Sequence, residues 1–362
     1  LLHWLPCPQV HSRGRSEEEN KRQVWIPVAA FSCVFLLGLA GSASASGLIL
    51  YELGTPDVGL ASAGYAARAE DASTLFKNPA GMSRFESNQL QVGAQVLYGD
   101  LGFVPDSLTT VDGNDGGNPV GWFPGGGIFY VHNLSPKWAA GAGAFSYFGL
   151  GQQYDSGWVG RYYIQEALLL GFTLMPSVSY KANDWLSLGA GLNIMYGKLD
   201  QKVAVNNIDP RLADGLLELD SDTWGVGADL GVLIEPNETT RYGLTYISQV
   251  SLDFKATPQF SDLGAGLEGI LGRLGVLGTE LDLGMNVPHY VMASGYWELG
   301  EEWAVMGNLG WQNWEKFGMF EVSVSDTTSG SGLTTDMSLK DTWHIAGGAR
   351  FNATDDWRIT AG

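Results

Sequence analysis

Three histidines are the side chains best suited to acid–base or metal chemistry in this sequence. They are His132, His289 and His344, and the other two of the five histidines lie before residue 46. No His-Glu-x-x-His pattern occurs, so the zinc site of a metalloprotease is not predicted. A barrel lipid hydrolase would need a serine and a histidine on neighbouring lipid-facing strands, for which His132 and His344 are candidates. Because isolated strand histidines usually serve structure, the sequence predicts neither an enzyme nor a metal site.

Glycine-rich runs are the next candidates for chemistry, because such loops can hold phosphate groups. Gly197-Lys198 is followed by leucine, which does not match a phosphate-binding loop. The runs at 125–127 and 141–143 lie inside alternating patterns and lack the strand-to-helix context of a nucleotide site. We therefore expect no cofactor.

The composition favours a membrane β-barrel over a soluble domain. Charged residues make up 16% of the 362 residues, aromatic residues 12%, and there are 50 glycines. Soluble domains carry about a quarter charged residues, whereas a barrel exposes an apolar face to lipid. The net charge of −19 makes nucleic acid an unfavourable partner.

The first 45 residues have the order of a secretory leader. Residues 1–20 are polar and without pattern, and we interpret them as spurious upstream sequence. Residues 21–45 contain Lys21-Arg22, an apolar run and the ending Ala43-Ser44-Ala45, which predicts a signal peptide. A transmembrane helix is the alternative, but the apolar run is short for a span of about 20 residues. Both cysteines lie upstream of the predicted cleavage site, so no disulfide framework is expected.

The elements that must position any functional side chain are β-strands. About ten stretches alternate between apolar residues and small or polar ones, each long enough to cross a bilayer. They are predicted at 87–99, 121–133, 138–149, 166–181, 185–199, 221–235, 240–255, 286–299, 303–322 and 338–352, with another strand beginning at Trp357.

Every second connection between these strands is a short polar turn followed by an aromatic residue. The aromatic residues after these turns are Trp138, Trp185, Tyr242, Trp303 and Trp357. The intervening connections are long, and this asymmetry is typical of outer-membrane barrels. The aromatic residues would form a belt at the membrane interface.

The segment 46–86 carries a resemblance to a known family. It contains Gly47-Leu48, Glu70-Asp71-Ala72 and Asn78-Pro79-Ala80. Later runs fit the same pattern: Leu244-Thr245-Tyr246, Asp253-Phe254-Lys255 and Lys340-Asp341-Thr342-Trp343. In this order and spacing, residues 46–362 resemble the FadL family of outer-membrane transporters, which includes TodX-type hydrocarbon channels.

The resemblance implies an all-β fold, a transmembrane antiparallel barrel of the 14-stranded type. Residues 46–86 would form an N-terminal hatch that plugs the lumen, with Asn78, Pro79 and Ala80 as its motif, and 87–362 the barrel. The strand count then suggests that C-terminal strands are missing. The implied function is passive uptake of hydrophobic compounds across the bacterial outer membrane. The implied partners are a hydrophobic small molecule, outer-membrane lipid and the barrel-assembly machinery.

Two apolar loops are predicted to capture the ligand. One spans about 203–221, and the other spans 257–284 with leucines at helical spacing. Exposed apolar loops suggest a ligand, although the two loops could instead pack on each other and cap the barrel. By resemblance they form a groove, and the expected ligand contacts in it are Leu263, Leu267, Leu271 and Leu274.

The resemblance also implies an inner pocket and a lateral exit. Leu48 and Leu50 would line the pocket, and Gly149 matches a strand kink that opens the wall, because glycine weakens strand pairing. Basic residues that hold a fatty-acid carboxylate are not evident, since Lys202 and Lys340 lie only near the matching positions. Arg161 could serve instead, or the substrate could be a neutral hydrocarbon. A general porin or a structural barrel is the alternative function.

Overall fold

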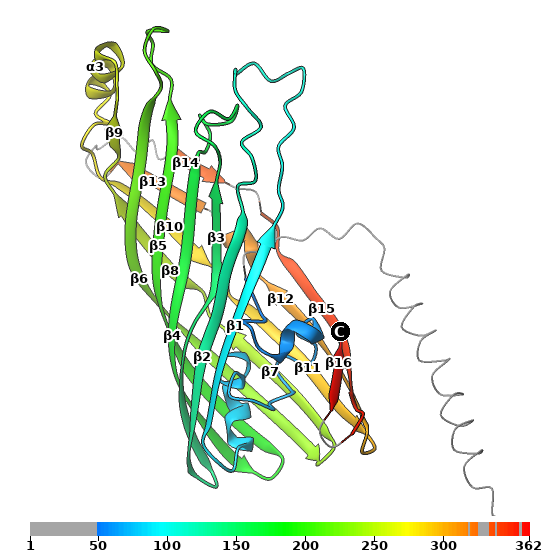
Figure 1. Cartoon of the computed structure of the whole chain (residues 1–362). Helices are drawn as coiled ribbons and strands as arrows, with labels where there is room; N and C mark the ends of the chain where they lie inside the picture. Colours follow the sequence, from blue (N-terminus) through cyan, green and yellow to red (C-terminus); the bar gives the residue numbers. More distant parts are fainter. Residues whose placement is uncertain (1–48, 318, 325–332, 337–338, 355–356) are drawn as a thin grey trace, which may run out of the picture. The chain divides into compact units, whose positions relative to one another are not determined.

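The computed structural model describes residues 49–317, 319–324, 333–336, 339–354 and 357–362. The predicted leader at 1–45 and the expected pocket residue Leu48 lie outside this set. Antiparallel strands dominate the described residues (Figure 1). Within these residues, no helix has both the length and the apolar character needed to cross a bilayer.

The structure contains five short helices and sixteen strands in the part of the chain that it describes. The short helices are η1 (Pro56–Leu60), α2 (Thr74–Lys77), η2 (Pro79–Arg84), α3 (Ala265–Arg273) and η3 (Trp314–Lys316). The strands are β1 (Gln89–Gly99), β2 (Gly121–Ser135), β3 (Trp138–Gln153), β4 (Glu166–Asn183), β5 (Leu186–Val205), β6 (Gly215–Asn237), β7 (Thr240–Ile247), β8 (Val250–Ala256), β9 (Gln259–Ser261), β10 (Leu281–Val287), β11 (Tyr290–Leu299), β12 (Trp303–Gln312), β13 (Met319–Val324), β14 (Leu333–Asp336), β15 (Thr342–Asn352) and β16 (Arg358–Ala361).

The main sheet has the order β1-β2-β3-β4-β5-β6-β7-β11-β12-β15-β16, with β9 paired to β6. A second sheet has the order β14-β13-β10-β8. All pairs are antiparallel between neighbours, as consecutive hairpins require. Over the residues that the structure covers, the main sheet is open, with β1 and β16 at its two edges.

Each predicted strand has an observed counterpart, but three of the predicted strands are interrupted. The stretch 240–255 is divided into β7 and β8, and 286–299 into β10 and β11. The second break contains Pro288, which has no N–H to donate to a ladder. The third break, within 303–322, holds the 3₁₀ turn η3 between β12 and β13, whereas the predicted strand 338–352 corresponds to β15 alone.

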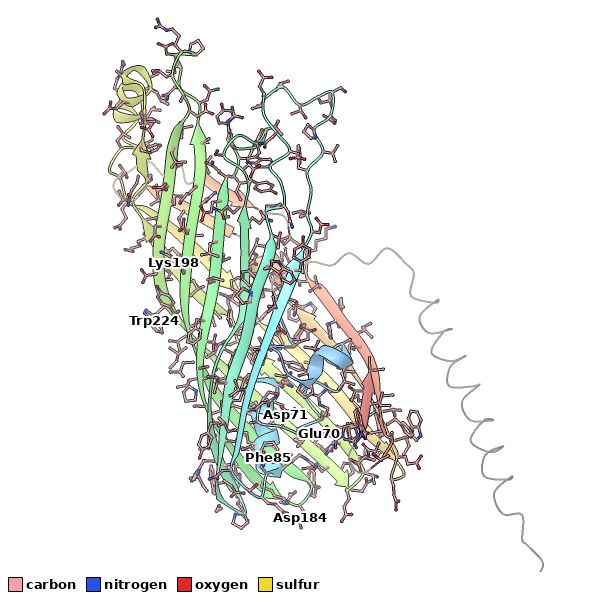
Figure 2. All side chains as sticks on the ribbon, viewed as in Figure 1. Glu70, Asp71, Phe85, Asp184, Lys198 and Trp224 are labelled. Atoms are coloured by element: carbon pink, nitrogen blue, oxygen red, sulfur yellow. The ribbon has the colours of Figure 1, made fainter. Side chains whose placement is uncertain are left out.

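The outer face of the sheet is apolar. On β1, the side chains of Leu90, Val92 and Val96 are 68%, 67% and 62% exposed, and alternate residues face the other way. Tyr196 packs on Trp224 in a tilted ring contact of 5.2 Å on this outer face, and Figure 2 shows Lys198 further toward the long loops than Trp224. An apolar band bordered by aromatic pairs is the surface that a lipid bilayer requires.

The inner face carries small and polar side chains together with large apolar ones, and the segment 49–86 packs against it. We call this segment the hatch segment (Figure 1). Its backbone N–H groups donate hydrogen bonds to side chains of several wall strands. Gly54 N donates to Gln95 Oε1 at 2.8 Å, and Ala66 N donates to Ser294 Oγ at 2.9 Å. Polar side chains of the wall therefore satisfy backbone N–H groups of the hatch segment.

One predicted loop is shorter than expected. The stretch 203–221 was predicted as loop, but β5 continues to Val205 and β6 begins at Gly215. The ladder continues through the pair Val205↔Gly215, leaving only residues 206–214 as the connection. The loop prediction was wrong at both ends because two antiparallel strands can stay paired beyond the apolar band. The leucines of this stretch gave no sign that the pairing continues.

Candidate functional site

The ladder between β2 and β3 ends part-way along both strands. Their pairing runs from Ser135↔Trp138 to Gly127↔Phe145 and goes no further in the described chain. Beyond that point β2 remains paired with β1, and β3 remains paired with β4 up to Gln153. The two strands meet again where Gln153 N donates to the carbonyl of Pro119 at 2.8 Å. The wall therefore has a window, which we define as the unpaired edges 120–126 and 146–152.

A bulge in β3 forms this window. The register between β3 and β4 shifts between Phe145 and Phe148, and Ser146 Oγ donates to the carbonyl of Gly171 at 3.0 Å. Extra residues in one strand bend it away from its neighbour. Gly149, the residue expected at the kink, pairs regularly with Leu170 just beyond the irregularity. The distortion is therefore centred on Ser146 and Tyr147.

The start of the hatch segment lies beside the bulged part of β3. Leu50 N donates to the carbonyl of Tyr147 at 2.7 Å, and Ile49 forms an isolated antiparallel bridge with Phe148. Residues 49 and 50 thus satisfy part of the edge that β2 leaves unpaired. In hydrocarbon an unsatisfied backbone group costs several kcal/mol, so this contact has a direct energetic reason.

Behind the window lies an apolar interior. Phe145 and Phe148 are almost completely buried, as are Met195, Leu252 and Phe254 from other strands. Gly197 provides room for this contact, because a Cβ there would touch Leu252 and Phe254. The apolar cluster is therefore continuous from the window to the side chains on the inner face of the sheet.

A few polar groups interrupt this interior, and the sequence did not single them out. Tyr147 OH accepts from Asn193 Nδ2 at 2.7 Å, and Tyr65 OH lies 3.0 Å from Tyr290 OH. Asp229 is fully buried and its Oδ1 accepts from Thr245 Oγ1 at 3.2 Å. Their partners lie on other elements, at least 16 residues away in the chain, so no local motif could have indicated them.

The Asn-Pro-Ala motif attaches the hatch segment to the wall. Asn78 Nδ2 donates to the carbonyl of Ala66 at 2.7 Å and to that of Val232 at 2.9 Å. Its Oδ1 accepts from Ala80 N at 3.1 Å. Pro79 begins the 3₁₀ helix η2, where its missing N–H is not needed. The motif therefore joins two parts of the hatch segment to β6.

Glycines on three wall strands make room for this attachment. A Cβ at Gly189 would overlap the backbone of Ala80, and one at Gly243 would overlap the carbonyl of Ala66. A Cβ at Gly231 would overlap the side chain of Asn78. Only glycine permits so close an approach of two backbones.

A buried ion cluster stabilises the hatch segment internally. Asp57 is fully buried, forms an ion pair with Arg68 at 2.6 Å and also contacts Lys77. Burial works to raise the pKa of the Asp57 carboxyl, but the charges of Lys77 and Arg68 outweigh it and hold the pKa below its ordinary value. The carboxylate therefore remains ionised and binds two cations that would otherwise be buried alone.

Comparison with known proteins decides the family. The family model described as outer membrane protein transport protein (OMPP1/FadL/TodX) matches residues 36–362. The chain belongs to this family of outer-membrane proteins. It is 26% identical to the long-chain fatty acid transport protein of Escherichia coli K12, over 90% of this chain and 79% of that one. It is also 26% identical to outer membrane protein P1 of Haemophilus influenzae Rd, over 90% and 78% of the two chains.

Solved structures share the fold. A Pseudomonas aeruginosa FadL homologue superposes with a TM-score of 0.70 at 20% identity, covering 86% of this chain and 79% of that one. The Ralstonia pickettii toluene transporter TbuX gives 0.61 at 18% identity, covering 85% of each chain.

The two apolar loops of this FadL-type chain contact each other. Asn207 Nδ2 donates to the carbonyls of Ala213 and Asp262, at 2.6 Å and 3.0 Å, and its Oδ1 accepts from Gly264 N at 2.7 Å. The predicted helical spacing corresponds to α3, which has no buried residue. Leu274 at its C-terminus is 69% exposed, while Leu263, Leu267 and Leu271 are partly exposed. Leu267 and Leu271 are four residues apart in α3, Leu263 precedes the helix and Leu274 caps its C-terminus, so ligand contact by these residues stays a prediction.

Arg161 is held by neighbours in the loops. Its Nε donates to Asp214 Oδ2 at 2.7 Å, and one Nη donates to the carbonyl of Asp112 at 2.8 Å. The other Nη donates to Tyr162 OH at 2.9 Å, and that hydroxyl donates to Asp214 Oδ1 at 2.7 Å. The hydrogen bond to Asp214 raises the pKa of Arg161 further. This geometry joins three loops and leaves the guanidinium already occupied.

The remaining candidates for chemistry are dispersed. His132 lies on β2 beside Tyr130 OH, at 3.2 Å, while His344 lies on β15 against the ring of Tyr51. His289 contacts Trp311. In the described part of the chain, no three metal-ligating side chains come together.

Proposed function

We propose that this chain is an outer-membrane channel through which hydrophobic compounds diffuse passively inward. The apolar surface of residues 206–214 and 262–274 captures the compound, and Leu263, Leu267, Leu271 and Leu274 contact it. Residues 46–86 act as the hatch, with Leu48 and Leu50 beside the inner pocket. The compound leaves sideways into the membrane through the window between β2 and β3.

One observation supports this path above the others: two strand edges remain unpaired inside an apolar wall, and residues 49 and 50 lie against one of them. An unpaired edge in lipid is costly, so its presence needs a reason. A greasy ligand gains nothing from a watery channel and is more stable in hydrocarbon. Withdrawal of the first hatch residues would open a route of that kind.

The occupied Arg161 favours a role in loop structure over contact with the substrate. Relatives are named for long-chain fatty acids and for toluene. We therefore propose that this chain carries hydrophobic compounds of the same kind, either long-chain fatty acids or hydrocarbons.

A removable lock on the hatch tests this function. Ile49 and Phe148 are bridge partners, whose Cα atoms lie at about 4.5–5.5 Å in such pairs, within the range that a disulfide spans. We expect Ile49→Cys with Phe148→Cys to lose uptake of a labelled hydrocarbon after oxidation and to regain it with a reductant. The control pair Val92→Cys with Ile128→Cys joins strands that are already paired. Uptake that continues at the wild-type rate in the oxidised 49–148 protein would refute the lateral route.

A further inference from the structure

The carboxylate of Glu70 in the hatch segment, whose position is labelled in Figure 2, lies among arginines of the wall. It contacts Arg350 of β15, and lies 3.8 Å from Arg241 of β7 and 3.7 Å from Arg358 of β16. Tyr296 OH also donates to it at 3.1 Å. One hatch carboxylate therefore joins strands from distant parts of the sequence.

Two arginines of this cluster are buried, whereas the side chain of Arg358 is 58% exposed. The side chains of Arg241 and Arg350 are only 4% and 10% exposed. A second carboxylate, Glu298, lies 3.8 Å from Arg241 and 3.7 Å from Arg350, while Arg241 also stacks on Tyr296 at 3.8 Å. Burying two guanidinium groups side by side is unfavourable unless anions accompany them.

A further arginine, Arg84 of η2, adds positive charge. It pairs with Glu235 of the wall. Burial, followed by the positive charge of Arg241, lowers the pKa of Arg84 to about 10. Within the described residues, four arginines thus face three glutamates in a protein whose net charge is −19.

This cluster has unused donors. Nε of Arg84, Nε and one Nη of Arg241, and Nε of Arg350 are buried without a hydrogen-bond partner among the residues placed in the structure. A buried donor without an acceptor costs about 1–3 kcal/mol, and more when it is charged. The cluster can therefore accept an anion more readily than the rest of the acidic protein.

A cavity borders the Arg84 end of this cluster. It has a volume of about 1090 Å³ and lies between residues 83–86 and three turns, at 133–136, 181–185 and 235–238. Arg84 and Glu235 form part of its lining, and Figure 2 places Phe85 and Asp184 at this same end of the sheet. A volume of this size accommodates a drug-sized ligand.

We propose that Arg84, Arg241 and Arg350 form an anion-exchange site, in which the carboxylate of a ligand replaces that of Glu70 and releases the hatch segment. Arginine binds carboxylates through two parallel hydrogen bonds. Replacing one carboxylate by another leaves no buried cation unpaired, so the exchange avoids the main cost of opening. This inference rests on the proposed function, because it gives the hatch of that channel a chemical trigger.

Binding to the protein purified in non-ionic detergent tests the site. Palmitate is compared with hexadecanol, which has a similar chain without the carboxylate, and with acetate, which has the carboxylate without the chain. We expect at least tenfold tighter binding of palmitate than of hexadecanol. Arg350→Gln should remove that preference and leave hexadecanol binding unchanged, while Lys198→Gln, on the outer face of β5 and outside the cluster, should change neither.

Glu70→Gln keeps the test decisive if Arg350→Gln fails to fold. Without its resident carboxylate, the site should bind palmitate several-fold tighter than wild type. Hydrogen exchange of residues 64–72 should rise in wild type when palmitate binds. Competition by acetate would identify any free carboxylate as a ligand, and its failure would restrict the site to amphiphiles.

Two results separate the possible failures. Equal binding of palmitate and hexadecanol in wild type, with Glu70→Gln unchanged, would overturn the anion site and leave the channel intact. If cells that produce the protein took up no hydrophobic compound faster than cells without it, the proposed function itself would be refuted.

Discussion

Replacing Asn78 by alanine should loosen the hatch segment. Its amide makes three buried hydrogen bonds, to the carbonyls of Ala66 and Val232 and from Ala80 N. Each contributes about 1 kcal/mol net, and unmet buried partners add to the loss. Asn78→Ala should therefore lower the free energy of hatch opening by about 3 kcal/mol.

A change of about 3 kcal/mol raises the open population roughly 150-fold. Hydrogen exchange of the amides in residues 64–84 measures that population directly, because local opening governs their exchange. The strand amides of β4 and β5 should keep their protection, since the wall remains paired. Asn118→Ala is the matched control, because Asn118 makes its hydrogen bonds in an exposed loop.

Unchanged exchange in a folded Asn78→Ala protein would refute this reasoning. It would show that the ion cluster of Asp57 and the glycine contacts hold the hatch segment without the amide. Global loss of protection, extending into β4 and β5, would equally contradict it, because the three bonds involve only the hatch segment and one carbonyl of β6.

Two further predictions concern the same segment. Gly243→Ala should displace the hatch segment, because its Cβ would overlap the carbonyl of Ala66. In a thermal unfolding scan it should lower the free energy of unfolding by about 1–3 kcal/mol. Gly347→Ala is the control and should be neutral in the same scan, because a Cβ there meets open space. Asp57→Asn should cost about 3–5 kcal/mol near neutral pH. Because the folded pKa of Asp57 is below its ordinary value of 3.8, its contribution is present above pH 3.8 and is lost as the pH falls through the folded pKa. Urea titrations at pH 7 and below pH 3.8 should therefore show the wild-type advantage shrinking in acid, and a constant advantage would contradict the assigned ion pairs.

Most of the fold could be predicted from alternation alone. The exposed Leu90, Val92 and Val96 of β1 follow the period of two that a half-buried strand imposes. The breaks in the strands were harder to predict, because η3 and the gap at Ser248 and Gln249 depend on packing between strands. Apolar residues on both sides of each break continue the same pattern.

The lateral exit stays a prediction, and Gly149, the residue expected at its kink, lies within the window edge 146–152. Glycine is a reasonable marker for a bend, yet this wall contains many glycines, and Gly149 remains in a regular pair. The bulge at Ser146 and Tyr147 requires a comparison of two strands to detect, because a single sequence carries no register. In the second apolar loop, by contrast, the helical spacing of the leucines correctly indicated the helix α3, while ligand capture by these leucines stays a prediction.

The arginine cluster marks the limit of reading one sequence. Arg241, Arg350 and Glu70 lie far apart in the chain, and each alone reads as an ordinary polar residue. Burial holds part of the hatch segment, because Leu53, Tyr65 and Phe76 belong to the main apolar cluster. Polar contacts to several strands add to this attachment, and among them the ion pairs of Glu70 are the ones that another carboxylate could replace. Such contacts give a segment that is firmly seated in the absence of a competitor and that opens when a suitable anion arrives.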